Sequence, residues 1–379
     1  MTSFDRRFLI ERVETYPLLY RLPQAYGDAN GYKRYRSTFL VRIITRAGID
    51  GWGEIVDWLP TLDRGFRERI IPFLLGKDAS GRLMIAEVIS KWHQRSASGV
   101  SMALSEIVAK AANMSVCQLW GGAIHRTIPV YASFQSYSER DDWIEHSLSQ
   151  VAAATEAGFS KVKVKIGGRS VQEDQQHIAR MMDMLPEEIQ VALDANQSYD
   201  LATTRQWTRL LDRYANWMWL EEPMPMEHVD EYAKLRAALP IPLAGGENLI
   251  RCTHYLALFR QGAIDIAQPD VLHTEGIESY RIMLQAARQF GYRVSPHTFD
   301  GGLARLYTLF AQACLPAWSK MDSEPIEPIE WDVMENPFTA LFPLYPVNGE
   351  VTIPDGPGIG LAPNWEIINA MRWDGSVYA

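Results

Sequence analysis

Acidic residues recur at the ends of successive short apolar segments, and this spacing limits the folds open to the chain. Asp194 ends the segment VALD, Glu221 ends WMWLE and Glu247 ends IPLAGGE. A (β/α)8 barrel assembles its site in this way, from the C-terminal ends of parallel strands. Oxygen ligands without Cys or His favour a hard divalent cation. The spacing therefore predicts a barrel whose mouth holds one Mg²⁺ ion, bound by these three carboxylates.

Further polar residues are expected at the same mouth. Lys163 and Lys165 lie two residues apart in KVKVKIG and so share one face of a strand. Asp270 ends IDIAQPD, and His297 follows one strand–helix unit later in YRVSPHT. Alone, a Lys-x-Lys pair is usually a solvated strand face, and a strand-end Asp is commonly a helix cap. Their joint occurrence favours a functional site.

The alternation of strands and helices continues over most of the chain. The expected strands are 128–134, 161–167, 190–196, 217–223, 241–247, 264–270, 292–298 and 325–331. Apolar strands separated by helices favour a closed parallel barrel, an α/β fold of the TIM-barrel type. A doubly wound open sheet is the structural alternative, but it would gather polar groups at one switch point.

We expect three segments along the chain. Residues 1–126 are expected to form an α+β capping domain, with antiparallel strands from about 8 to 58 and helices from about 62 to 113. Residues 127–335 form the catalytic barrel. Residues 336–379 are turn-rich and are expected to pack back on the capping domain without extending the barrel.

Composition narrows the classes of function. Of the 379 residues, 47% are hydrophobic and 22% charged, as in a globular protein, and no run of about 18 apolar residues offers a membrane span. The charged N-terminus and the three unpaired cysteines, Cys117, Cys252 and Cys314, favour the cytoplasm. A net charge of −9 without a basic patch argues against nucleic acid. We expect a small-molecule substrate and a homo-oligomer.

Together, the motifs KVKVKIG, LDAN, WLEEP, GGEN, QPD and SPHTF resemble the enolase superfamily, specifically its mandelate racemase branch. The resemblance covers nearly the whole chain, from GWGE in the capping domain to VNGEVTIPDGPGIGL in the tail. It implies an enolase-like modified barrel. The muconate-lactonizing branch usually has Asp as third metal ligand and Lys on the sixth strand, whereas this chain has Glu247 and Asp270 there.

The resemblance implies a role for each matching residue. Asp194, Glu221 and Glu247 match the Mg²⁺ ligands, and Lys165 matches the base. Lys163 matches a neighbour that contacts the substrate carboxylate and lowers the pKa of Lys165 by like-charge repulsion. The remaining matches are the Asp–His dyad of Asp270 and His297, a polar neighbour of the metal at Asn196, and an acid on the eighth strand, Glu330, that hydrogen-bonds the developing enolate.

Two stretches depart from the family pattern. Ser101 and Ser105 stand on a helix where many relatives place Asp and Trp, which we expect to affect packing or assembly. After the sixth strand, VLHTEGI replaces the paired glycines of many relatives, so His273 or Glu275 is expected to reshape the substrate pocket.

The leading hypothesis is a Mg²⁺-dependent dehydratase of acid sugars, aldonates or aldarates, that yields a 2-keto-3-deoxy acid. The polar segment between the first two strands favours it, because a loop closing over the barrel could bind hydroxyls or a distal carboxylate through Tyr26, Lys33, Arg34 and Arg36. The alternatives are a racemase or epimerase, or a sugar-lactone cycloisomerase. A non-catalytic binding protein on the same fold is a remote alternative.

Overall fold

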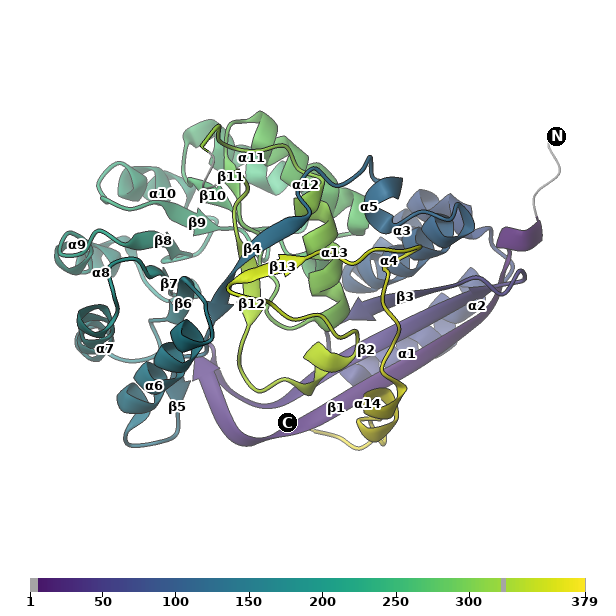
Figure 1. Cartoon of the computed structure of the whole chain (residues 1–379), viewed down its shortest axis with the longest axis horizontal. Coiled ribbons are helices and arrows are strands. Elements are labelled where there is room, and N and C mark those ends of the chain that lie inside the picture. The colour runs from purple at the N-terminus through teal and green to yellow at the C-terminus, as the bar shows by residue number, and fades with distance from the viewer. Residues whose placement is uncertain (1–5, 322–324, 379) are drawn as a thin grey trace.

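The structure is a computed structural model that describes residues 6–321 and 325–378. An N-terminal domain of antiparallel strands and helices lies beside a larger domain in which parallel strands alternate with helices (Figure 1). Among the described residues, no helix is both long enough and apolar enough to cross a membrane.

The N-terminal sheet has the expected antiparallel meander. Its strands, in the order β3-β2-β1-β5, are β1 (Ile10–Asp28), β2 (Gly31–Thr45), β3 (Asp50–Ile55) and β5 (Tyr137–Ser138). The helices of this domain are η1 (Arg6–Phe8), α1 (Leu59–Gly65), η2 (Phe66–Ile70), α2 (Ile71–Leu74), η3 (Ala79–Gly81), α3 (Arg82–Ser90), α4 (Gln94–Ala111) and α5 (Val116–Leu119). Helix α4 approaches β3 so closely that a Cβ on Gly53 would lie 1.8 Å from the carbonyl oxygen of Gly99. Only glycine fits at this contact.

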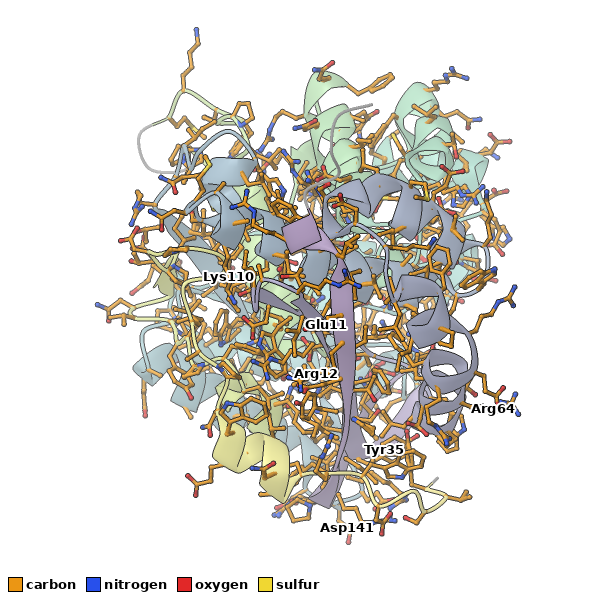
Figure 2. The ribbon with its side chains drawn as sticks, turned by 90° about the vertical axis from the view of Figure 1, so that its right-hand side faces the viewer. Glu11, Arg12, Tyr35, Arg64, Lys110 and Asp141 are labelled. Carbon is orange, nitrogen blue, oxygen red and sulfur yellow. The ribbon has the colours of Figure 1, made fainter. Side chains whose placement is uncertain are left out.

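The polar segment expected to be a loop is instead the end of a long hairpin. Strand β1 continues to Asp28 and β2 begins at Gly31, so that only two residues form the turn. Figure 2 shows how far β1 runs across this domain. Strand β5, which follows the first barrel strand, pairs with β1 through Tyr26↔Ser138 and Gly27↔Tyr137. This pairing fastens the hairpin end to the barrel domain.

The larger domain is a curled sheet of parallel strands. In the order of hydrogen bonding these strands are β11 (Arg293–Val294), β10 (Ile266–Ala267), β9 (Leu243–Gly245), β8 (Trp217–Glu221), β7 (Gln190–Asp194), β6 (Lys161–Lys165), β4 (Thr127–Ser133) and β12 (Ile329–Asp332). Strands β11 and β12 share no ladder, but Ser295 Oγ donates to the carbonyl oxygen of Pro328 at 2.6 Å across the gap. The predicted barrel with a capping domain is confirmed as the fold class.

Helices and turns connect the strands and cover the outside of the sheet (Figure 1). They are α6 (Trp143–Glu156), α7 (Val171–Met184), α8 (Leu201–Arg205), α9 (Thr208–Leu211), α10 (Val229–Arg236), α11 (Cys252–Gln261), η4 (Val271–His273), α12 (Ile277–Gln289) and α13 (Gly302–Ala313). Helix α12 packs against α4 of the capping domain, where Ser101 Oγ accepts a hydrogen bond from the amide of Ile277 at 2.9 Å. Ser101 therefore has a packing role.

All the barrel strands except β4 are shorter than the sequence predicts, and proline interrupts several of them. Proline has no amide hydrogen for a ladder bond. Pro269 and Pro296 follow β10 and β11, and the eighth strand begins at Ile329, directly after Pro328, instead of at Pro325. The chain beyond each strand then forms the barrel mouth.

The C-terminal segment contacts both domains. Its elements are η5 (Pro337–Ala340), β13 (Glu350–Thr352) and α14 (Trp365–Ala370). Near the capping domain, the amide of Leu19 in β1 donates to the carbonyl oxygen of Met371, just beyond α14, at 2.9 Å. Strand β13, however, pairs antiparallel with β4 and adds a strand to the barrel sheet. The expectation that the tail does not extend the barrel is therefore wrong. The division at 126/127 and 335/336 stays a prediction.

Candidate active site

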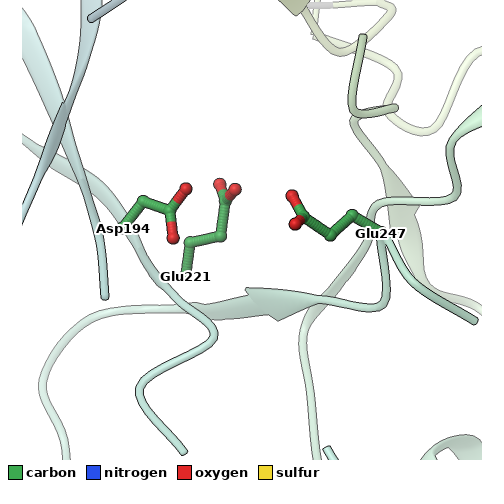
Figure 3. A group of neighbouring side chains, drawn as sticks. All are labelled: Asp194, Glu221 and Glu247. Atoms are coloured by element: carbon green, nitrogen blue, oxygen red, sulfur yellow. The ribbon is translucent and has the colours of Figure 1, made fainter. Parts of the chain in front are cut away.

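Adjacent strands place the three predicted metal ligands at one level of the barrel mouth. The register pairs Lys165 with Asp194 and Asp194 with Glu221, while Glu247 follows the next strand, β9. One oxygen of each carboxylate lies within 4.8 Å of one oxygen of the others, and the side chains converge as Figure 3 shows. Three mutually repelling acids this close need positive charge between or beside them.

The donor set fits a hard divalent cation. Asp194 and Glu221 are buried and Glu247 is half-buried, so an ion held by them would be largely shielded from solvent. Asn196 lies beside them, and its amide donates to Asp194 Oδ1 at 2.9 Å. Its side-chain Oδ1 has no hydrogen-bond partner among the described residues. Three carboxylates and a neighbouring amide oxygen are ligands that Mg²⁺ accepts.

Lys163 lies beneath the carboxylates and is completely buried. Its Nζ is 2.6 Å from Glu221 Oε1, 3.0 Å from Glu330 Oε1 and 3.5 Å from Asp194 Oδ2. Burial alone would lower the pKa of Lys163, but the charges of Glu221 and Glu330 raise it well above the usual value. Lys163 is therefore a permanent cation that holds these acids together.

Lys165 reaches the same cluster from the next inward position of β6. Its Nζ is hydrogen-bonded to Asp194 Oδ2, and the side chain lines the cavity at the barrel mouth. Burial lowers the pKa of Lys165 and so does the like charge of Lys163, as predicted. The attraction of Asp194 outweighs both, and the net pKa lies above its usual value.

The buried acids Glu221 and Glu330 differ in pKa. Burial, followed by the charge of Asp194, raises the pKa of Glu221 to about 7. Burial also disfavours the charged form of Glu330, but Lys163 and His297 lower the pKa of this acid to about 2. Glu330 also accepts hydrogen bonds from Ser133 Oγ at 2.5 Å and from the amide of Thr298 at 3.0 Å. Glu330 is thus a fixed anion.

The predicted Asp–His pair is present. His297 Nδ1 lies 2.6 Å from Asp270 Oδ2, and Nε2 lies 3.0 Å from Glu247 Oε2. Burial lowers the pKa of His297, but Glu247, Glu330 and Asp270 raise it well above the usual value. The carboxylates near the two ring nitrogens favour the imidazolium form of His297, which can donate a proton.

A cavity of about 340 Å³ opens over this cluster. Lys165, Asn196, Glu247 and His297 line its inner part. The capping hairpin lines the outer part with residues 28 and 30–33. A space of this size accommodates a small organic acid. Lys163 and Glu330 do not line the cavity, and both are completely buried.

Of the four predicted hairpin contacts, only Lys33 lines the cavity; its Nζ donates to Asp300 Oδ1 at 3.1 Å. Arg36 is buried and pairs with Asp300 at 3.0 Å and with Asp332 at 2.9 Å. The structure places Arg34 beside Glu139 at a separate hollow. Tyr26 is buried, and its hydroxyl donates to the carbonyl oxygen of Glu335 at 3.3 Å.

Of the two residues that depart from the family pattern after the sixth strand, one reaches the cavity. His273 lines it, and its Nδ1 lies 2.9 Å from the carbonyl oxygen of Glu247. Glu275 instead pairs with Arg251 at 2.5 Å.

Several contacting residues were not predicted. Gln268 and Trp219 both donate to Glu221 Oε2, at 2.7 Å and 2.9 Å, and so orient this carboxylate. Trp219 lies two residues before Glu221 on the same face of β8, which is a pattern that could have revealed it, whereas Gln268 lies just beyond β10, two residues before Asp270. Asp300 and Gln135 also line the cavity, but they lie in loops without such a pattern.

Comparison with known proteins agrees with this geometry. Residues 147–367, more than half of the chain, match the family model described as enolase C-terminal domain-like. Residues 29–121 match the N-terminal domain of mandelate racemase / muconate lactonizing enzyme. The chain belongs to the mandelate racemase/muconate lactonizing enzyme family of the enolase superfamily. The resemblance inferred from the six motifs is confirmed.

Relatives within this family catalyse more than one reaction. D-galactarolactone cycloisomerase of Agrobacterium fabrum is 31% identical, over 96% of this chain and 98% of its own length. Arabinonate dehydratase of Saccharolobus solfataricus is 30% identical, over 69% of this chain and 68% of its own. A racemase from Streptomyces coelicolor A3(2), solved with bound magnesium, shares the fold with a TM-score of 0.84 at 22% identity, over 96% of this chain and all of that one. The protein is thus an enzyme of the lyase or isomerase class.

Proposed function

We propose that the protein is a Mg²⁺-dependent acid-sugar dehydratase that converts an aldonate or aldarate to a 2-keto-3-deoxy acid. The observation that carries this proposal is that Lys165 and His297 line one cavity with Glu247, whose carboxylate lies within 4.8 Å of those of Asp194 and Glu221. Lys165 comes from the second barrel strand and His297 follows the seventh, so we infer that they approach the substrate from opposite sides.

The carboxylate triad accounts for the metal in this proposal. Held by Asp194, Glu221 and Glu247, the ion would bind the substrate carboxylate and stabilise the second negative charge that develops when the α-proton is removed. The relative solved with magnesium supports this choice of ion. Lys163 adds a buried positive charge beside these carboxylates, and its pairing with Glu221 and Glu330 fixes its position.

The side chains divide the proton transfers between them. In its neutral form, Lys165 Nζ takes the proton from the α-carbon, and the electron pair of that C–H bond forms the enediolate. The enediolate then expels the β-hydroxyl as the β C–O bond breaks, and His297 Nε2 supplies the proton that converts it to water. The enol product tautomerises to the 2-keto-3-deoxy acid. Asp270, 2.6 Å from Nδ1, orients the imidazole for this step.

A sugar-lactone cycloisomerase is the second candidate. The relative that spans almost the whole chain at 31% identity supports it. The same residues would remove the α-proton and expel a β-oxygen, but this oxygen would be the ring oxygen of a lactone and would stay attached. Racemisation also uses two groups on opposite faces: one removes the α-proton, and the other returns a proton to the same carbon from the opposite side.

A screen of aldonates, aldarates and their lactones tests the proposal. The dehydratase forms a 2-keto acid 18 Da lighter than its substrate, whereas a cycloisomerase or racemase conserves the mass. Chelation should abolish turnover and added Mg²⁺ should restore it. Turnover without any divalent ion, or no α-proton chemistry on the whole panel, would contradict the proposal. Light scattering tests the expected homo-oligomer, and a cytoplasmic location stays a prediction.

A further inference from the structure

Glu222 directly follows the metal-ligand candidate Glu221 but is not a member of the carboxylate triad. It is buried, with 1% of its surface exposed, and no role was predicted for it. Its Oε2 accepts a hydrogen bond from Gln197 Nε2 at 2.5 Å, and its Oε1 accepts one from the amide of Gly246 at 2.8 Å. Both carboxylate oxygens are therefore occupied by donors from two different loops.

Those two loops carry the other members of the triad. Gln197 lies three residues after Asp194, and Gly246 directly precedes Glu247. The backbone of Glu222 adds two bonds, because its carbonyl oxygen accepts from the amide of Gln197 at 2.6 Å and its amide donates to Ala244 at 3.0 Å. One residue thus connects the three strand ends β7, β8 and β9.

The backbone at this junction is strained. Asn196, Gln197 and Glu222 have φ values of +44°, +62° and +37°, in the left-handed region that non-glycine residues rarely adopt. Such a conformation persists only where the surrounding contacts determine it. Strain at three residues, each within three positions of a metal-ligand candidate, indicates that these loops are held in place for the site.

Tight packing at β9 leaves the connection little freedom. A Cβ on Gly245 would lie 2.9 Å from Glu222 Cγ, and one on Gly246 would lie 2.4 Å from the hydroxyl oxygen of Tyr255. That hydroxyl donates to the carbonyl oxygen of Gly246 at 2.7 Å. Gly246 is therefore held from both sides, with Glu222 at its amide and Tyr255 at its carbonyl.

We propose that Glu222 is a positioning residue that clamps the loops after β7 and β9, and so presets the spacing of Asp194, Glu221 and Glu247 for metal binding. The inference rests on the proposed metal site. It requires two side-chain hydrogen bonds at this position, one to Gln197 and one to Gly246, and no direct contact with metal or substrate.

The test compares Glu222→Leu with Glu222→Gln. Leucine removes both acceptors and leaves the amide of Gly246 and the side chain of Gln197 without partners. Glutamine keeps one acceptor oxygen, and the amide of Gln197 can turn its own oxygen toward the new NH₂ group, so that both bonds survive. The exposed Glu227, in the loop after β8, supplies matched controls, Glu227→Leu and Glu227→Gln.

Two measurements on the full-length protein decide the question. Calorimetric titration with Mg²⁺ should show about 10–100-fold weaker binding for Glu222→Leu, but affinity near wild type for Glu222→Gln and both controls. In the metal-free protein, amide hydrogen exchange in residues 195–199 and 243–249 should accelerate in Glu222→Leu alone. A purely structural role would lower the melting temperature without changing Mg²⁺ affinity.

Other outcomes overturn the inference. Wild-type Mg²⁺ affinity in Glu222→Leu contradicts it, and so does an equal loss in Glu222→Gln, which would assign the effect to charge instead of the clamp. If Glu222→Leu does not fold, Gln197→Leu removes one bond from the opposite side and must weaken binding. If the wild type binds no Mg²⁺, the proposed metal site fails, and hydrogen exchange alone then decides whether Glu222 clamps the two loops.

Discussion

Replacing Lys163 by methionine is a strong test of the charge arrangement in the site. Lys163 is fully buried, and three carboxylates, those of Asp194, Glu221 and Glu330, lie within 3.5 Å of its Nζ. Methionine has a similar length and no charge, so Lys163→Met removes the cation and creates little empty space. The acids would then lie close together in a buried environment with less compensating charge.

The magnitude follows from this burial. Removing one partner of a buried ion pair costs about 3–5 kcal/mol, because an uncompensated charge remains. We therefore expect Lys163→Met to lower the free energy of unfolding by about 3–5 kcal/mol in the metal-free protein. A divalent cation bound by the triad would replace the missing charge, so the deficit should shrink in Mg²⁺, since ligand binding stabilises the folded state by mass action.

Urea unfolding, followed by circular dichroism in EDTA and in excess MgCl₂, measures both quantities. Lys161→Met, on the same strand and the same side but partly exposed, serves as the control and should change stability by no more than about 1 kcal/mol. A deficit below about 1 kcal/mol for Lys163→Met in EDTA would refute the charge argument. An equal deficit with and without Mg²⁺ would refute the link between Lys163 and the metal site.

Three further predictions concern other parts of the molecule. Burial lowers the pKa of His177 to about 4, so between pH 6.5 and 4 the unfolded chain binds more protons than the folded one. The free energy of unfolding should therefore decrease by about 3 kcal/mol as the pH falls from 6.5 to 4. Urea titrations of wild type and His177→Gln at several pH values test this, and parallel stability profiles would contradict it. Lys33→Ala should change the ratio of kcat/KM between substrates that differ at the distal end, whereas Arg34→Ala, which lies outside the cavity, should leave it unchanged. Gly53→Ala should lower stability by at least about 1–3 kcal/mol, because its Cβ would strike the carbonyl oxygen of Gly99. Gly65→Ala, whose Cβ would meet open space on α1, should raise stability by about 0.5–1 kcal/mol. Equal melting temperatures for the two variants would contradict the packing described here.

The sequence contained the information needed to predict the triad. Each acid follows an apolar strand, and parallel strands of one barrel end at the same edge, so local pattern and topology lead to the same three residues. Lys163 and Lys165 were predictable for the same reason, because positions two apart on a strand share a face. The structure adds that only Lys165 reaches the cavity.

The capping hairpin was predictable only in part. Its polar composition indicated a position near the substrate, but the contacts depend on partners more than 100 residues away. Arg36 pairs with Asp300 and Asp332, and Arg34 pairs with Glu139. These long-range ion pairs direct the arginines away from the cavity and leave Lys33 at its wall. Glu222 was missed because its clamp depends on loops from two other strands.

Solvent deuterium exchange at the α-carbon tests the central claim most directly. Wild type, Lys165→Ala and His297→Asn are incubated in D₂O with an acid sugar that the wild type dehydrates, and proton NMR follows α-exchange and 2-keto acid together. We expect His297→Asn to exchange the α-proton without eliminating water, and Lys165→Ala to do neither. Full dehydration by Lys165→Ala would show that Lys165 is not the base and would contradict this account.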